Sequence, residues 1–359
     1  MIHSIWIKSF RCLKENLFSF EKDPFISIIS KNNVGKTSLL EACYVLGNLN
    51  SFTTKNLANV VPFEQDISLI GIKLNHLNRS LNYYLKIDSL GKKYITLNNQ
   101  VVRRKTDIQS LFRVNYISSD SLFFITSQPS FRRKELDQSL SQFSLSYRKN
   151  LATYKRLILQ KNKLFKMNQD TALIRNINKL LAPLIIEIQK ERILYLREVE
   201  TRINEFFNRI KFPLQSLEIK YQSKTQFLTQ ADQVLDFLNE NLSKESLSRM
   251  SLYGPHRDDF IFIGNERVIK EFYSRGVCRT VAYFFQLSQS LIMQDKTQLP
   301  MLLLLDEPFS EIYKDLKSEL ISQIPNSFYV IYTSTQKDEI TSLKNSSLYA
   351  INDGLICKI

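Results

Sequence analysis

Eight residues between an apolar run and a helical pattern constrain this chain most. They are Ser30, Lys31, Asn32, Asn33, Val34, Gly35, Lys36 and Thr37. Residues 26–29 before them favour a strand, and residues 37–49 after them carry apolar positions at helical spacing. Such a strand, loop and helix predict a phosphate-binding P-loop, in which loop N–H groups surround phosphate oxygens. Lys36 would then meet the β and γ phosphates, and the Thr37 hydroxyl would bind Mg²⁺.

The P-loop pattern is incomplete, because its first glycine position holds Ser30. Asn33 tolerates the left-handed backbone region better than most residues and can therefore preserve the turn. An alternative stays open at this point: the segment is an ordinary turn between a strand and a helix, capped by Asn32 or Asn33.

A second segment supplies the acidic groups that such a loop requires. Five consecutive apolar residues, 301–305, end in Asp306 and Glu307. This pattern predicts a buried parallel strand that places carboxylates at its carboxyl end, where α/β folds bind ligands. We expect Asp306 to hold Mg²⁺ together with Thr37, and Glu307 to orient and polarise the attacking water. The alternative is a buried strand that ends in a solvated acidic turn.

A third segment lies about thirty residues before that strand. Ser274 and Gly276 open an apolar helix that covers residues 281–291. A serine hydroxyl and free N–H groups at a helix N-terminus form an anion site, which would contact the γ-phosphate held by another subunit. The alternative is a loop with a simple helix cap.

The rest of the chain predicts a mixed α/β protein in three parts. Residues 1–129 carry the P-loop and, between residues 67 and 97, the alternation of an antiparallel sheet. Residues 130–212 predict an inserted helical arm in which Pro183 is either a kink or a first-turn residue. Residues 213–359 return to strands and contain the acidic segment.

Composition adds weaker constraints. The formal net charge of +14 favours an anionic partner such as nucleic acid, although an AT-rich genome would produce a similar composition. Four distant cysteines without CxxC spacing argue against a zinc site or a disulfide framework. Early charges at Lys8 and Arg11, with no apolar run near 20 residues, predict a cytoplasmic protein that does not enter the membrane.

Several further segments carry a family resemblance. Four of them occur in the same order as in that family. They are residues 5–11 (Ile-Trp-Ile-Lys-Ser-Phe-Arg), 51–54 (Ser-Phe-Thr-Thr), 120–122 (Asp-Ser-Leu) and 129–137 (Pro-Ser-Phe-Arg-Arg-Lys-Glu-Leu-Asp). The most specific match is the heptapeptide Tyr253-Gly254-Pro255-His256-Arg257-Asp258-Asp259. Together these segments resemble the RecF family, ABC-type ATPases related to the heads of SMC proteins. The resemblance implies an ABC-type P-loop ATPase head with an antiparallel subdomain and an inserted helical arm, termed lobe II.

The resemblance also identifies further motif segments and the positions at which this sequence differs from the family's pattern. Ser310 and Glu311 resemble the D-loop, residues 333–335 resemble the switch segment, and residues 213–359 would carry the signature, Walker B and switch segments. Ser30 and Asn33 stand where relatives have glycine, Val277 where they have glutamine, and Tyr313 where they have aspartate. Two alternatives follow: a weak, DNA-stimulated ATPase, or a nucleotide-binding DNA-repair scaffold without significant hydrolysis.

The function that the resemblance implies is ATP- and Mg²⁺-dependent. An ATP-dependent homodimer would bind single-stranded or gapped DNA, act with RecR and RecO, and promote RecA loading during gap repair and SOS induction. The family's arm and heptapeptide disfavour a transporter ATPase. Candidate contacts to DNA phosphates are Arg103, Arg104, Lys105, Arg132, Arg133 and Lys134. His256 is a nucleotide sensor or a structural residue, and Arg257 either pairs internally or reaches phosphate.

Overall fold

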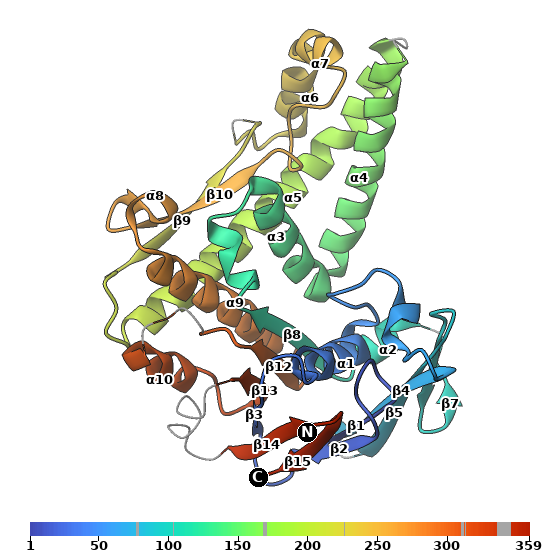
Figure 1. The fold of residues 1–359 in the computed structure, drawn as a ribbon. Coiled ribbons are helices and arrows are strands. Elements are labelled where there is room, and N and C mark those ends of the chain that lie inside the picture. The colour runs from blue at the N-terminus through green and yellow to red at the C-terminus, as the bar shows by residue number, and fades with distance from the viewer. Residues whose placement is uncertain are drawn as a thin grey trace. The chain divides into compact units, whose positions relative to one another are not determined.

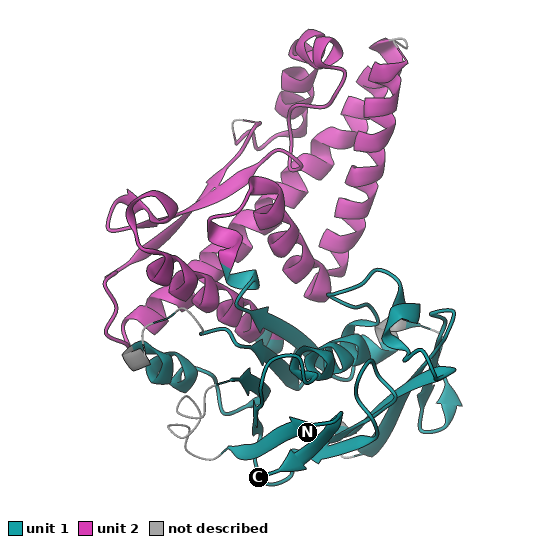
Figure 2. Cartoon of the chain, in the orientation of Figure 1, with its two compact units in different colours: residues 1–122, 294–359 teal, residues 123–293 magenta. Residues whose placement is uncertain are grey.

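The computed structural model describes residues 1–76, 79–102, 104–167, 171–225, 227–309, 312, 314–335 and 346–359. Two compact units divide the chain (Figure 2), the first formed by residues 1–122 and 294–359 and the second by residues 123–293. Packing therefore divides the chain after residues 122 and 293. The functional division after residues 129 and 212 stays a prediction.

A six-stranded sheet in the first unit contains the acidic strand. In spatial order it consists of β15 (Leu355–Lys358), β14 (Ser347–Asn352), β3 (Phe25–Ile29), β13 (Phe328–Ser334), β12 (Met301–Asp306) and β8 (Arg113–Ser118). The β12 strand pairs in parallel with both neighbours, β8 and β13. The side chains at positions 301–305 are fully buried, which confirms the predicted buried parallel strand.

The second sheet of this unit is antiparallel, as predicted between residues 67 and 97. Its order is β2 (Asn16–Ser19), β1 (Ile2–Lys8), β4 (Ile67–His76), β5 (Arg79–Asp88), β6 (Lys93–Leu97) and β7 (Gln100–Val101). The other described elements of the unit are η1 (Leu57–Val60), α2 (Lys105–Gln109), α10 (Lys314–Ser322) and the start of η2 (Ser121–Ile125).

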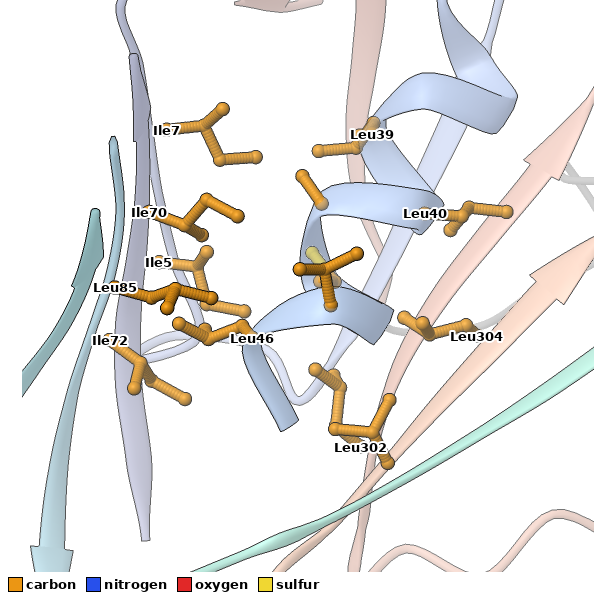
Figure 3. Close-up of a cluster of buried hydrophobic side chains, with 14 of the residues drawn as sticks. Ile5, Ile7, Leu39, Leu40, Leu46, Ile70, Ile72, Leu85, Leu302 and Leu304 are labelled. Atoms are coloured by element: carbon orange, nitrogen blue, oxygen red, sulfur yellow. The ribbon is translucent and has the colours of Figure 1, made fainter. Parts of the chain in front are cut away.

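The helix α1 (Lys36–Asn48) lies between the two sheets and joins their cores (Figure 1). Figure 3 shows Leu46 facing Leu85 of the antiparallel sheet, while Leu40 lies on the opposite side, toward Leu304 of the parallel sheet. A helix buried on two sides requires the wide apolar stripe that its sequence carries. Because the P-loop begins this helix, packing of α1 fixes the position of the loop.

The second unit is mainly helical, and residues 130–212, the predicted arm, fall within it. Its helices are α3 (Pro129–Phe143), α4 (Leu145–Lys166), α5 (Thr171–Phe207), α6 (Ala231–Glu240), α7 (Leu242–Ser248), α8 (Ile269–Phe272) and most of α9 (Arg275–Thr297). A small antiparallel sheet, in the order β11 (Arg267–Val268), β10 (Asp259–Gly264) and β9 (Leu217–Gln222), completes it. Pro183 lies inside α5, so it is not a first-turn residue. No helix among the described residues is long and apolar enough to cross a membrane.

Candidate nucleotide-binding site

The predicted P-loop connects the end of β3 to the start of α1. Asn33 has a φ of 63° and Gly35 a φ of 110°, so both occupy the left-handed region. The φ of Gly35 is strained for any residue with a side chain, and a Cβ there would lie 2.8 Å from the Sγ of Cys12, which would have to shift. The predicted tolerance of Asn33 for this conformation is confirmed, and the loop keeps its turn with only one glycine.

Lys36 is almost buried at the base of this loop, with 6% of its surface exposed. Its Nζ donates to the carbonyl oxygens of Ser30, at 2.7 Å, and Lys31, at 3.2 Å. The same atom lies 2.9 Å from Oε1 of Glu307. The structure therefore brings the predicted phosphate-binding lysine and the predicted water-orienting carboxylate into direct contact.

Asp306 accepts hydrogen bonds from three hydroxyl groups. Its Oδ2 accepts from Oγ1 of Thr37 and from the phenol of Tyr116, both at 3.0 Å. Its Oδ1 accepts from Oγ1 of Thr333 at 2.9 Å. Thr37 and Asp306, the two predicted Mg²⁺ ligands, are therefore adjacent, although 269 residues separate them in the sequence.

The sequence did not indicate Tyr116, and it indicated Thr333 only as part of the switch segment, without its contact to Asp306. Both stand directly beside the acidic strand, because β8 and β13 pair with β12, and Thr333 is the register partner of Asp306. Burial, followed by the charge of Asp306, raises the pKa of the Tyr116 phenol, which therefore stays a hydrogen-bond donor. The strand order would have been needed to predict these two contacts with Asp306 from the sequence.

Glu307 has an unusual backbone conformation, with a φ of 46°. Its N–H donates to the carbonyl oxygen of Thr333 at 3.2 Å, which anchors the turn after β12. Left-handed backbone at a residue other than glycine stores strain, and such strain concentrates at functional sites. Its side chain is 30% exposed and is paired with Lys36.

Ser30, the main departure from the P-loop pattern, supplies a structural bond. Its hydroxyl donates to the carbonyl oxygen of Ile29 at 2.6 Å and accepts from the N–H of Ile351 at 2.7 Å. The side chain that replaces glycine thus connects the loop to β14. This bond gives a physical reason for serine at this position, and it directs the hydroxyl away from the loop's N–H groups.

A buried carboxylate behind the site anchors residues 51–54. Glu41 of α1 is 1% exposed and accepts hydrogen bonds from Arg11, Ser51 and Thr53. The bond to Glu41 raises the pKa of the Arg11 guanidinium. Phe52, held in this way, stacks on the ring of Tyr116 with centroids 3.9 Å apart. The loop thereby supports the tyrosine that contacts Asp306.

The predicted signature residues lie in the other unit. Ser274 caps α9, because its hydroxyl accepts from the N–H of Val277 at 3.4 Å and its carbonyl from that of Cys278 at 3.1 Å. Gly276 lies in the first turn of the same helix. This geometry is that of a helix cap, and a contact with nucleotide in a second subunit stays a prediction. Ser310, Glu311 and Tyr313 lie outside the described residues.

The heptapeptide at residues 253–259 forms a tightly packed turn. Gly254 has a φ of 120°, and a Cβ there would lie 2.5 Å from the hydroxyl of Tyr154. The carbonyl of Pro255 accepts from Nη1 of Arg192 at 2.7 Å. Asp258 is fully buried and accepts hydrogen bonds from Gln189, Tyr221 and the N–H of Lys224. These contacts give the heptapeptide a structural role.

His256, in the same turn, has a hydrogen bond at each ring nitrogen. Nδ1 lies 2.6 Å from the Tyr154 hydroxyl, and Nε2 lies 3.1 Å from the carbonyl oxygen of Ser251. Burial, with smaller contributions from the nearby cations Arg257 and Lys161, lowers the pKa of the imidazole to about 4, although the bond to Ser251 opposes this shift. The ring is therefore neutral at physiological pH, as expected for a structural histidine.

Two basic residues that were expected to contact DNA are held inside the fold. Arg132 is 2% exposed and makes a bidentate contact with Asp259, at 2.9 and 2.6 Å, so its prediction as a DNA contact is wrong. Arg133 is half-buried and donates to the carbonyl of Asp258 at 2.8 Å. Lys134 and Arg104 are exposed. Arg103 and the side chain of Lys105 lie outside the described residues.

Arg257 is exposed, and the two carboxylates that follow it in the sequence bind other groups. Its guanidinium instead donates to the carbonyl of Ser251 at 3.3 Å and contacts Sδ of Met250 at 3.0 Å. The expected internal pairing with Asp258 or Asp259 is therefore wrong. A contact with phosphate stays a prediction.

The residues at the loop fit a nucleotide with Mg²⁺. The left-handed residues Asn33 and Gly35 curve the loop ahead of α1, and Lys36, Thr37 and Asp306 meet at its base. Among the described residues, no group of three or more His, Cys, Asp or Glu side chains could hold a metal. One carboxylate with one hydroxyl suits Mg²⁺, which keeps several waters and shares its remaining positions with phosphates.

Comparison with known proteins gives a consistent family likeness. No protein-family model matches the chain. The DNA replication and repair protein RecF of Staphylococcus carnosus is 27% identical over 371 residues, covering 99% of this chain and 100% of the relative. The RecF protein of Staphylococcus aureus strain JH9 is 26% identical over 370 residues, with the same coverage.

Solved structures give the same fold. A structure of the recombination mediator protein RecF-ATP, in the RecFOR pathway, has a TM-score of 0.83 and 24% identity, covering 100% of this chain and 97% of that one. The SMC head bound to the C-terminal winged-helix domain of ScpA has a TM-score of 0.62 at 13% identity, covering 100% and 96%. The predicted ABC-type head is therefore confirmed as a fold.

Proposed function

Because this chain belongs to the RecF family and has the fold of an ABC-type ATPase head, we propose that it is an ATP-dependent DNA-binding protein of replication and repair. The observation that carries this proposal is the meeting of the P-loop with the acidic strand. Thr37 lies 3.0 Å from Asp306, and Lys36 lies 2.9 Å from Glu307. These are the groups that phosphoryl chemistry requires in one place.

Each of the chain's own residues would have a separate role at this site. Lys36 and the loop N–H groups would bind the phosphates of ATP, while Thr37 and Asp306 would hold Mg²⁺. Glu307 would orient and polarise a water molecule. Bound Mg²⁺ would supply positive charge that offsets charge developing on the phosphates. Ser274 and Gly276 of a second subunit would complete the site, so ATP would favour a homodimer.

The substrate and partners follow from the family. The dimer would bind single-stranded or gapped DNA, act with RecR and RecO, and help load RecA during gap repair and SOS induction in the cytoplasm. The names of the relatives and of the solved structures, which place RecF in DNA replication, repair and the RecFOR pathway, support this proposal.

The ion pair at the loop favours a second candidate function. Lys36 is held by two loop carbonyls and by Glu307, so phosphates would have to replace these contacts before turnover. Together with Val277 in the signature segment, this arrangement favours a nucleotide-binding repair scaffold with little hydrolysis. Weak, DNA-stimulated hydrolysis and the absence of hydrolysis are distinguished by the variants described in the Discussion.

Binding to gapped DNA tests the proposed function. We expect the affinity to be higher with ATP than without nucleotide. It should fall by at least about tenfold between roughly 50 and 200 mM salt, because lysine and arginine contacts to phosphate release counterions. Arg104→Ala with Lys134→Ala should reduce the salt slope, since both side chains are exposed. Binding that is insensitive to both salt and ATP, measured by fluorescence anisotropy, would contradict the proposal.

A further inference from the structure

A row of six aligned residues, four of them with aromatic or apolar side chains, crosses the outer face of the antiparallel sheet. Register places six residues directly opposite one another across all six strands: Leu17, Trp6, Gly71, Tyr84, Thr96 and Val101. Opposed residues point to the same face of a sheet, and the other face packs on α1. Leu17, Tyr84 and Val101 are 67%, 39% and 75% exposed. Exposed apolar groups in one row indicate a binding surface.

The aromatic centre of this row has a specific geometry. The rings of Trp6 and Tyr84 meet edge to face, with centroids 6.2 Å apart. A Cβ at position 71 would lie 2.6 Å from the Tyr84 ring, so only glycine lets this ring lie down on the sheet. The Tyr84 ring therefore lies over Gly71, and the Trp6 ring stands nearly perpendicular beside it, with 83° between the ring planes; we call this pair the Trp6–Tyr84 platform.

Polar and basic rows flank the platform on both sides. Ser4, Lys73 and Asn82 form the row on one side, and Lys8, Leu69, Lys86 and Tyr94 form the row on the other. Each flanking row lies two residues along the strands, at about 7 Å from the platform. The face thus alternates from cationic to aromatic to cationic.

The acidic side chains near this face, Glu15 and Asp88, are already bonded to other groups. Glu15 accepts from Nε1 of Trp6 at 3.1 Å and lies 3.0 Å from Nζ of Lys8, and these bonds lower its pKa. Asp88 accepts from the N–H of Lys92 at 2.8 Å and from the Tyr94 hydroxyl at 3.1 Å. Within the described part of the chain, no carboxylate lies within ion-pair distance of Lys73 or Lys86. These two lysines supply uncompensated positive charge on either side of the platform.

A pocket opens between the platform and the first flanking row. Its volume is about 360 Å³, and its walls include Trp6, Tyr84, Leu17, Ser4, Lys73 and Asn82. The face of one ring with the other ring set at its edge, an aliphatic wall, an amide and a hydroxyl match a flat heteroaromatic group that carries donors and acceptors at its edge. The nearby ammonium group matches an anion attached to that group.

We propose that this face binds an unpaired base of single-stranded DNA, with the base on the Trp6–Tyr84 platform and the adjoining phosphates at Lys73 and Lys86. Bases stack on exposed aromatic side chains regardless of sequence, while cationic groups follow the backbone. The inference rests on the proposed DNA-binding function and assigns it a site for single strands on the antiparallel sheet, away from the nucleotide loop.

Trp6 makes the test direct, because it is the only tryptophan in the sequence. Titration of the wild-type protein with oligo(dT) of roughly ten nucleotides should quench its fluorescence. An abasic strand with the same number of phosphates should bind more weakly and leave the fluorescence unchanged, as should duplex DNA. Quenching by oligo(dT) alone supports the platform and requires no variant.

Matched variants separate stacking from simple charge. Tyr84→Ala should weaken oligo(dT) binding by roughly 5- to 150-fold, the range for losing one stacked base. Tyr84→Phe keeps the ring and should bind like wild type. Lys73→Ala should weaken binding to the oligo(dT) and abasic strands alike.

The outcomes distinguish this inference from the proposed function. Binding to single-stranded DNA without any change in Trp6 fluorescence, and with Tyr84→Ala equal to wild type, overturns the platform and leaves the proposed function intact. The absence of any DNA binding, at low salt and with ATP, overturns both.

Discussion

Lys36→Ala is expected to weaken ATP binding by roughly 10- to 150-fold, because a charge-assisted hydrogen bond contributes about 1.5–3 kcal/mol. Lys36 lies at the base of the loop with 6% of its surface exposed, and its ammonium group is 2.9 Å from Glu307. Isothermal titration with ATP and Mg²⁺ measures this loss.

Lys31→Ala is the matched control, since Lys31 belongs to the same loop and its side chain is exposed. It removes the same charge and should retain most of the affinity. If Lys36→Ala binds ATP as tightly as Lys31→Ala, the loop is not a phosphate site, and the alternative of an ordinary capped turn would be correct.

Glu307→Gln separates binding from turnover at the same site. Its amide can still accept a hydrogen bond from Lys36, so ATP affinity should change little. Loss of a general base should lower hydrolysis by roughly 10²- to 10⁴-fold if the wild type turns over. A wild-type rate equal to that of Glu307→Gln, in the presence of DNA, would identify the chain as a scaffold.

Lys161→Met is expected to destabilise the second unit by about 3–5 kcal/mol. Lys161 of α4 and Glu245 of α7 lie 2.6 Å apart and are 1% and 0% exposed. Burial lowers the pKa of the Lys161 ammonium, and the charge of Glu245 opposes this shift. Removing the lysine leaves a carboxylate buried without its counter-charge, which is among the most costly single changes.

The double variant Lys161→Met with Glu245→Gln is the control for packing. The glutamine keeps an oxygen for the N–H of Leu252, which lies 2.9 Å from Oε1 of Glu245. Most of the lost stability should return. Urea unfolding followed by circular dichroism measures both effects. A double variant no more stable than Lys161→Met would show that packing, and not the buried charge, causes the loss.

This ion pair also supports the turn at residues 253–259. The chain from Ser251 to Leu252 is fixed by Asn162, at 2.7 Å, and by Glu245. Lys161→Met should therefore increase hydrogen exchange at Leu252, whose N–H donates to Glu245, before the unit unfolds globally. The specificity of the heptapeptide as a sequence pattern thus has a structural explanation, because His256, Asp258 and Asp259 each bond to a distant element of the second unit.

The sequence predicts those features that depend only on residues close to one another along the chain. The acidic strand, the loop before α1 and the antiparallel alternation all appear as expected, because periodicity and burial set them. The contacts of Tyr116 and Thr333 with Asp306 depend on which strands flank β12, and periodicity does not determine strand order.

The same limit explains Arg132. A run of three basic residues predicts an exposed surface, but Arg132 pairs with Asp259, which lies 127 residues later. Ser30 is a similar case, since its partner Ile351 is 321 residues away. Long-range polar pairs of this kind leave no local pattern in the sequence.

Measurement of the oligomeric state in solution tests the proposed ATP-dependent dimer most directly. Sedimentation velocity of the Glu307→Gln variant, with saturating ATP, Mg²⁺ and gapped DNA, should show a dimer, and removal of ATP should return the monomer. The Lys36→Ala variant should stay monomeric under both conditions. A chain that remains monomeric with bound ATP and DNA would contradict an ATP-dependent clamp.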